Sequence, residues 1–303
     1  MNILEHVRIV APLLALAIFM AVTPTEALAR DNLDALSAEQ AAFANRFLEF
    51  LQRVDAVAFG RIGRMNDVDE TENRSISSDH AEYDIKVARG PVVEKIGRTR
   101  TITRKPTREF ERPNLWSRYY LLDIHPKSPL VGMLHAAIVV QFFDDGTSTI
   151  AGFLDVLETA NRDEDLAYMR LAMDKVFDKH GVDPSPHRRL SKEGHDENDP
   201  LSVDNTKRRK TTMVGGSFYG NPLRAVNEPN FAFMTEAYET MLDAYLTVVE
   251  RRADDPYTDA DLAAQDEMRK NWLEDRFFAD PYTSSVTPYD AWSLYSLPPT
   301  VKF

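Results

Sequence analysis

Six segments between residues 83 and 157 constrain the fold of this chain more than any other feature. They are rich in β-branched and aromatic residues, and Gly-Pro, Lys-Pro, His-Pro and Asp-Asp-Gly turn signals separate them. The predicted strands cover 83–88, 92–96, 99–103, 116–124, 135–143 and 148–157. Because consecutive strands joined by short turns pair in opposite directions, this region predicts an antiparallel sheet.

Helical patterns lie on both sides of the predicted strands. A capping box at Ser37–Gln40 starts one helix, and Gly181 ends another, as glycine commonly does. The predicted helices cover 37–58, 163–180, 231–252 and 259–278. Residues 61–79 and 182–212 are polar and are expected to form loops. A helix, then a sheet, then helices predicts an α+β fold, in which helices flank a large antiparallel sheet.

The N-terminus has the pattern of a signal peptide. Arg8 precedes an uncharged run of 14 residues, Ile9–Val22, and Ala27-Leu28-Ala29 matches a cleavage site. The run is shorter than the roughly 20 residues of a membrane span. We therefore expect a signal peptide over 1–29, a single domain over 30–303, a periplasmic or secreted location, and no stable membrane span after cleavage. The alternative is an amphipathic or buried first helix.

Composition narrows the chemistry that is available. The 303 residues carry a net charge of −12, which disfavours nucleic acid as a partner. The absence of cysteine excludes disulfides, thiolate metal sites and a cysteine nucleophile. No nucleotide-binding or common hydrolase motif occurs. Any active site must therefore use the remaining polar side chains.

Five segments match, in order, the motifs of one enzyme family. They are His125–Val131 with His135-Ala136 (similar to HP-x-x-P-x-V-P-T-x-H), Gly90–Gly97 (GGVFEKAGV), Val214–Tyr219 (IGGLFFDDL), Phe231–Met234 with Asp243–Arg252 (FAFM…DAYLPIVERR), and Ser296–Phe303 (SMPPLVRW). Over roughly residues 80–303 the chain resembles the oxygen-dependent coproporphyrinogen III oxidases.

This resemblance implies a homodimer that oxidatively decarboxylates two propionates of a porphyrinogen, with dioxygen as the electron acceptor and without a metal or organic cofactor. The partner would be a small tetrapyrrole or pyrrolic acid. The implied catalytic residues are His135, Asp155 and Asp280. The implied substrate-binding residues are His125, Gly215 and Gly216. Arg98 and Arg100 are further substrate-binding candidates, not from the resemblance but because they form a positive stripe on one predicted strand.

Several family positions differ in this chain. The motif asparagine and arginine fall on Ala137 and Val139, and the late arginine falls on Pro281. A substrate with several carboxylates normally requires arginine partners. Three alternatives therefore stay open: a coproporphyrinogen oxidase-type enzyme, an exported enzyme for another small aromatic or pyrrolic acid, and a non-catalytic tetrapyrrole-binding or structural protein.

The residues taken alone leave roles open as well. His135 begins an apolar strand, where it could transfer protons or only cap the strand end. His125-Pro126 favours a rigid turn over a catalytic contact. Asp155, within an apolar strand, requires either hydrogen-bond partners or a cleft position with a perturbed pKa.

Two charged groups are harder to interpret. Arg98, Arg100 and Arg104 share one strand face, which either is solvated or faces the cleft and replaces the missing arginines. Histidines and aspartates in the polar region 182–212 have spacings that suit a divalent metal, but no regular element is expected to fix them. They are His187, His195, Asp196 and Asp199. We therefore expect no metal.

Overall fold

The computed structural model describes residues 33–103, 113–193, 209–220, 222–275 and 287–302, and its centre is an antiparallel sheet. Seven described strands pair in sequence order, each antiparallel to the next. They are β1 (Glu72–Ser77), β2 (Ala81–Ala88), β3 (Val93–Thr103), β4 (Asn114–Pro126), β5 (Leu134–Phe143), β6 (Ser148–Val156) and β7 (Gly216–Ser217). The predicted α+β fold with an antiparallel sheet is confirmed.

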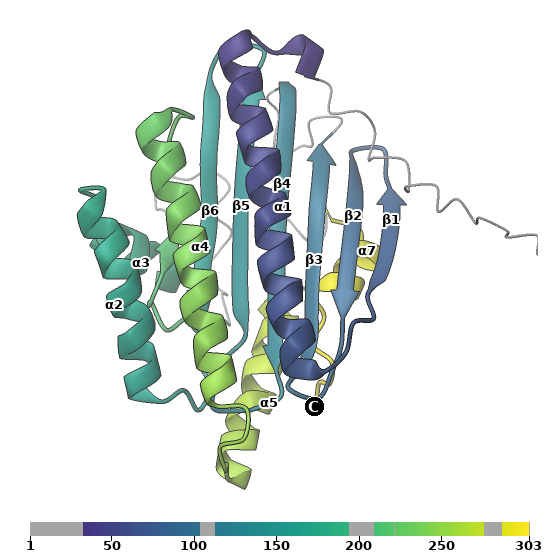
Figure 1. The fold of residues 1–303 in the computed structure, drawn as a ribbon, viewed down its shortest axis with the longest axis vertical. Helices are drawn as coiled ribbons and strands as arrows, with labels where there is room; N and C mark the ends of the chain where they lie inside the picture. Colours follow the sequence, from purple (N-terminus) through teal and green to yellow (C-terminus); the bar gives the residue numbers. More distant parts are fainter. Residues whose placement is uncertain (1–32, 104–112, 194–208, 221, 276–286, 303) are drawn as a thin grey trace, which may run out of the picture. The chain divides into compact units, whose positions relative to one another are not determined.

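Helices cover both faces of the sheet (Figure 1). On the near face in Figure 1 lie α1 (Ala38–Asn66), α2 (Asp163–Lys179) and α4 (Glu228–Arg251), and behind the sheet lie α5 (Asp259–Glu274) and α7 (Tyr289–Tyr295). A 3-10 turn, η1 (Leu33–Ala35), precedes α1, and α3 (Pro184–Glu193) packs beside β7. Within the described part of the chain, every helix is too short or too polar to span a bilayer.

The two sheet faces differ in chemistry because side chains alternate along each strand. The face under α1 and α4, called the α1 face below, contributes apolar residues such as Leu122, Ile138 and Leu154 to the main core. The opposite face, called the α5 face, carries buried polar residues, among them Asp123 and His135. The apolar face supplies the hydrophobic burial that stabilises the fold, and the other face is available for chemistry.

Both predicted loops contain regular structure. Residues 72–77 form β1, an exposed edge strand, and their polarity is explained by the absence of a buried face there. Residues 184–193 form α3, a polar helix that packs at one end of the sheet. The predicted strands 92–96 and 99–103 are one continuous strand, β3.

Helix ends follow their capping residues. Ser37 and Gln40 make the predicted capping box, and Gly181 adopts a left-handed φ of 63° just beyond α2. Helix α1 extends past the predicted end at residue 58, to Asn66, and Asp67 ends it with a φ of 51°. The last residues of the helix predicted over 259–278 lie outside the described residues.

A buried carboxylate joins α2 to α4. Asp165, whose side chain is 2% exposed, accepts hydrogen bonds from Arg251 Nη1 at 2.8 Å and from Arg252 Nε at 2.6 Å. The two arginines belong to the segment that resembles the family's VERR sequence. Their position indicates a structural role, since they neutralise a buried charge.

We expect Asp165→Ala to lower the free energy of unfolding by ~2 kcal/mol or more, because hydrogen bonds to charged groups contribute roughly 1.5–3 kcal/mol each. Urea denaturation at pH 7 measures the change. The matched control is Asp243→Ala, which removes a 72% exposed partner of Arg61 and should cost less than about 1 kcal/mol. Equal losses in both variants would contradict a special role for the Asp165 cluster.

Candidate active site

A row of polar residues crosses the α5 face of the sheet. The strand register pairs Gly97 with Asp123, Asp123 with His135, and His135 with Asp155. Residues paired across neighbouring strands point to the same face, so the three ionisable side chains share one surface. All three are at most 4% exposed. The antiparallel register thus brings together residues that are up to 32 positions apart in the sequence.

Asp123 and His135 form a direct pair. Their Oδ1 and Nδ1 atoms are 2.6 Å apart. Burial acts to raise the pKa of the Asp123 carboxyl, but the charge and hydrogen bond of His135 outweigh it, so that pKa lies below its usual value. Asp123 therefore stays ionised, and it orients the imidazole through Nδ1. The other ring nitrogen, Nε2, does not face Asp123.

Aromatic rings and an arginine surround His135. Its ring centroid lies 5.2 Å from that of Phe153 and 4.9 Å from that of Trp272. The Arg209 guanidinium lies over both rings, 5.5 Å from the Phe153 centroid and 5.9 Å from the Trp272 centroid. Arg209 Nε also pairs with Asp275 at 3.2 Å. A general acid–base group, two flat apolar walls and a cation are therefore adjacent.

Asp155 is held by several donors rather than by one cation. Its oxygens accept hydrogen bonds from Ser191 Oγ at 2.5 Å, Thr212 Oγ1 at 3.3 Å, and the backbone N–H groups of Val156 and Val214 at 2.9 and 3.2 Å. Burial raises the pKa of Asp155, and these hydrogen bonds only partly offset it. Of the two alternatives for this residue, the structure shows the hydrogen-bonded one, since Asp155 is fully buried and its carboxylate has four donors. Asp155 fastens α3 and the segment 212–214 to the sheet.

Lys95 and His125 form a second buried pair of cross-strand neighbours. Lys95 Nζ donates to the carbonyl oxygens of Leu297 at 2.7 Å and Ser293 at 3.3 Å. Burial and the Lys95 charge lower the pKa of His125 to about 3, so its imidazole is neutral at pH 7. His125 lies in β4 rather than in the predicted turn, because the strand continues to Pro126.

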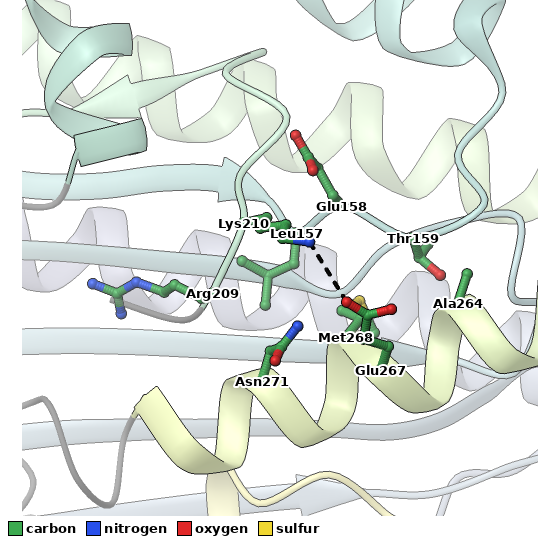
Figure 2. Close-up of a pocket in the computed structure, with 9 residues that line it drawn as sticks. All are labelled: Leu157, Glu158, Thr159, Arg209, Lys210, Ala264, Glu267, Met268 and Asn271. Carbon is green, nitrogen blue, oxygen red and sulfur yellow. Dashed lines mark ion pairs between the residues drawn. The ribbon is translucent and has the colours of Figure 1, made fainter. Parts of the chain in front are cut away.

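A pocket of about 160 Å³ opens beside this region, between α5 and the segment 209–210 (Figure 2). Leu157, Met268 and Asn271 are among its lining residues, and Lys210 and Glu267 form an ion pair across it at 3.5 Å. Met268 and Leu157 also pack in one cluster with Trp272. The pocket is therefore separated from His135 by little more than this apolar cluster.

The structure places Arg98 and Arg100 away from His135. Both lie on the α1 face, where Arg98 pairs with Asp55 at 2.9 Å and both arginines pair with Asp84 at 2.7 and 2.6 Å. Arg98 is 3% exposed, so the solvated-face interpretation is wrong for it. These arginines neutralise carboxylates beneath α1, and they do not point toward the site. Arg104 lies outside the described residues.

The glycines expected to bind substrate allow close packing. A Cβ on Gly215 would lie 1.9 Å from the Leu154 carbonyl oxygen, and one on Gly216 would lie 2.9 Å from His187 Cβ. Their bare backbone lets the chain run against β6 and α3. Asp280, the third predicted catalytic residue, lies outside the described residues.

The described residues contain no cluster of three potential metal ligands, so they give no support to a metal site in the polar region 182–212. Nδ1 of His187 is hydrogen-bonded to the Ser217 carbonyl oxygen at 3.0 Å, and Nε2 of the same ring lies 3.0 Å from Arg224 Nη2. The other three candidates, His195, Asp196 and Asp199, lie outside the described residues.

Four residues of the site, Lys95, Asp123, Arg209 and Trp272, were not predicted from the sequence. Asp123 carries the same signal as Asp155, an acid within an apolar strand, and could have been found by it. Lys95 lies in a family-like segment but had no assigned role. Arg209 and Trp272 come from distant parts of the chain and give no local signal.

The fold and this site define the class of protein: it is an α+β protein that carries a buried imidazole–carboxylate pair packed against two aromatic rings. The family model for coproporphyrinogen III oxidase matches residues 82–303. This range includes β2 from its second residue, strands β3–β7 and every residue of the polar row. The chain belongs to the coproporphyrinogen III oxidase family.

The opposite pKa shifts of Asp155, which is buried, and Asp84, which is partly buried, should give opposite pH dependences of stability. The raised pKa of Asp155 means that its ionisation destabilises the folded state, so Asp155→Asn should gain stability relative to wild type as pH rises from 3 to 7. Burial acts to raise the pKa of Asp84, but Arg98 and Arg100 lower it overall, so Asp84→Asn should lose stability over the same range. Urea midpoints at each pH test both signs. Parallel profiles for the two variants would contradict this assignment.

Proposed function

We propose that this protein oxidatively decarboxylates propionate side chains of a porphyrinogen or related pyrrolic acid. The observation that carries the proposal is the buried Asp123–His135 pair, which lies between Phe153 and Trp272 beside Arg209. Membership of the coproporphyrinogen III oxidase family supports the reaction class. Export, a homodimeric state and independence from metals and organic cofactors are further parts of the proposal, carried by the sequence alone.

In this proposal the flat walls hold a pyrrole ring and Arg209 binds a propionate. A guanidinium beside aromatic rings is partly desolvated, which strengthens its attraction to a carboxylate. The family motif has arginines at the positions of Val139 and Pro281 in this chain. Arg209 would supply the positive charge that those arginines provide. Asp155 has a positioning role, since it anchors residues 212–214 and so the segment that follows Arg209.

The chemistry balances with dioxygen as the oxidant. Each propionate loses carbon dioxide from its terminal carbon and a hydrogen with its electron pair from the β-carbon, which leaves a vinyl group. Dioxygen accepts those two electrons and, with two protons, becomes hydrogen peroxide. His135, oriented by Asp123, transfers protons at the pyrrole nitrogen, where charge changes as the side chain is oxidised.

A second candidate is a non-catalytic tetrapyrrole-binding protein. The loss of family residues favours it, because the motif asparagine and arginine fall on Ala137 and Val139, and neither side chain can bind a carboxylate. The two candidates differ in turnover, and the experiment below separates them.

Purified protein should be mixed with coproporphyrinogen without oxygen and then exposed to air, with vinyl products followed by chromatography. We expect wild type to form vinyl products. His135→Gln should lower kcat by about 10²–10⁴-fold, the range for lost general acid–base catalysis. Arg209→Gln should mainly raise KM, because Arg209 binds the carboxylate in the ground state.

Matched controls are available elsewhere in the fold. His180→Gln removes a histidine on α2 that pairs with Glu236, and Arg100→Gln removes an arginine on the α1 face. Both should leave kcat and KM close to wild type. Binding without turnover in wild type would overturn the enzymatic proposal and favour the binding protein.

A further inference from the structure

The segment 287–302, called the C-terminal segment below, is fastened to the sheet through its backbone carbonyls. Lys95 Nζ donates to the carbonyls of Ser293 and Leu297, and Trp272 Nε1 donates to that of Ser296 at 3.2 Å. The Tyr295 carbonyl lies so close to β3 that a Cβ on Gly97 would be 1.9 Å from its oxygen. A hydrogen bond between the Ser296 side chain and Asp123 and an ion pair between Lys302 and Asp266 at 2.7 Å add to these contacts.

The same contacts connect this segment to the candidate site. Trp272 holds Ser296 through its indole nitrogen, and its ring packs against His135. On the other side, Ala291, Trp292 and Tyr295 pack against β2 in a cluster separate from the main core. A small cluster of this kind can open without unfolding the rest of the sheet.

Lys95 is the titratable group at the centre of these contacts, and it is 1% exposed. From β4 it faces Asp123 and His125, and the charges of Arg89 and Glu72 also act on it. Arg269 approaches from α5, where it acts on His125 and pairs with Glu94. The contacts from the C-terminal segment are two carbonyl oxygens, which accept hydrogen bonds from a neutral amine as well as from an ammonium.

Burial, and then the charge of Arg89, lower the pKa of Lys95 from 10.5 to about 7, and Asp123 and Glu72 only partly oppose this. When the segment leaves, Lys95 meets water and its usual pKa returns. The closed state thus favours the neutral amine and the open state favours the ammonium. By linkage, closure strengthens as pH rises from about 7 toward 10 and weakens as pH falls through that range.

We propose that the C-terminal segment is a proton-coupled flap over the candidate site, which opens as pH falls from about 10 to 7, with Lys95 as the positioning residue that couples its closure to proton release. Release removes the Ser296 contact of Trp272 and frees the aromatic wall of His135. Such opening would uncover the side of the sheet that carries Asp123 and His135. The effect on turnover rests on the proposed function, whereas the release itself does not.

Hydrogen exchange of the full-length protein, followed by mass spectrometry and corrected for intrinsic rates, tests the flap. Peptides covering 289–297 should show an opening constant that falls about tenfold per pH unit between pH 7 and 9, as expected for the release of one proton on closure. The constant should level off below pH 7. Peptides from α4 in the same samples serve as the reference and should show no such slope.

Substitutions of Lys95 test whether this lysine causes the pH dependence of the opening constant. Lys95→Met removes the titrating group and should abolish the slope, and Lys95→Arg keeps the charge and should stay open at every pH. Lys86→Met, a half-buried lysine of β2 over the Phe59 ring, is the matched control and should keep the wild-type slope.

A wild-type opening constant that does not change between pH 7 and 9 would overturn the proposal, even if Lys95→Met fails to fold. A full slope in folded Lys95→Met would also overturn it. Neither result depends on a tetrapyrrole, so failure of the flap and failure of the enzymatic proposal are distinguishable.

Discussion

The hydrogen bond between Asp123 and His135 is the interaction on which the site depends. Both side chains are buried, and a buried carboxylate without a partner would cost several kcal/mol of stability. The bond exists only because β4 and β5 pair Asp123 with His135. A shift of one residue in that register would turn one partner to the opposite face, so sheet pairing and site chemistry are fixed together.

Burial of the apolar face of the same sheet offsets the free-energy cost of burying the polar row on the other face. Packing of α1 and α4 on that face buries the main hydrophobic cluster, which supplies most of the driving force for folding. The α5 face can then hold Lys95, Asp123, His135 and Asp155 at almost no exposure. Each has carbonyl, hydroxyl, amide, carboxylate or imidazole partners that reduce the cost of burial.

The fold was largely predictable because strand and helix periods are local signals. Among the exceptions, β1 and α3 are polar elements at the sheet edges, and they lack the buried stripe from which a strand or helix is predicted. Helix α7 was also missed, because seven residues are too few to show a helical period. Arg98 and Arg100 were correctly predicted to lie on the same face of their strand. The alternation of side chains along a strand does not identify which face a helix such as α1 will cover, so the pairing of these arginines with Asp55 and Asp84 was not predicted.

The site was predictable only in part, for a similar reason. His135 and Asp155 stand out as polar residues in apolar strands, and Asp123 carries the same signal. Arg209 and Trp272 join them through the packing of loops and α5, which no local pattern encodes. Tertiary contacts therefore supply the cation and the aromatic wall, and local sequence supplies the acid–base pair.

Nitrogen NMR of ¹⁵N-histidine-labelled protein is the most direct measurement of the proposed role of the Asp123–His135 pair, with His135→Gln used to assign the resonances. We expect Nδ1 of His135 to carry a proton directed at Asp123, and the Nε2 resonance to shift when coproporphyrin, the non-reacting oxidised form, is added. An Nδ1 without a proton, or bound coproporphyrin that leaves the His135 resonances unchanged, would contradict the placement of the site at this pair.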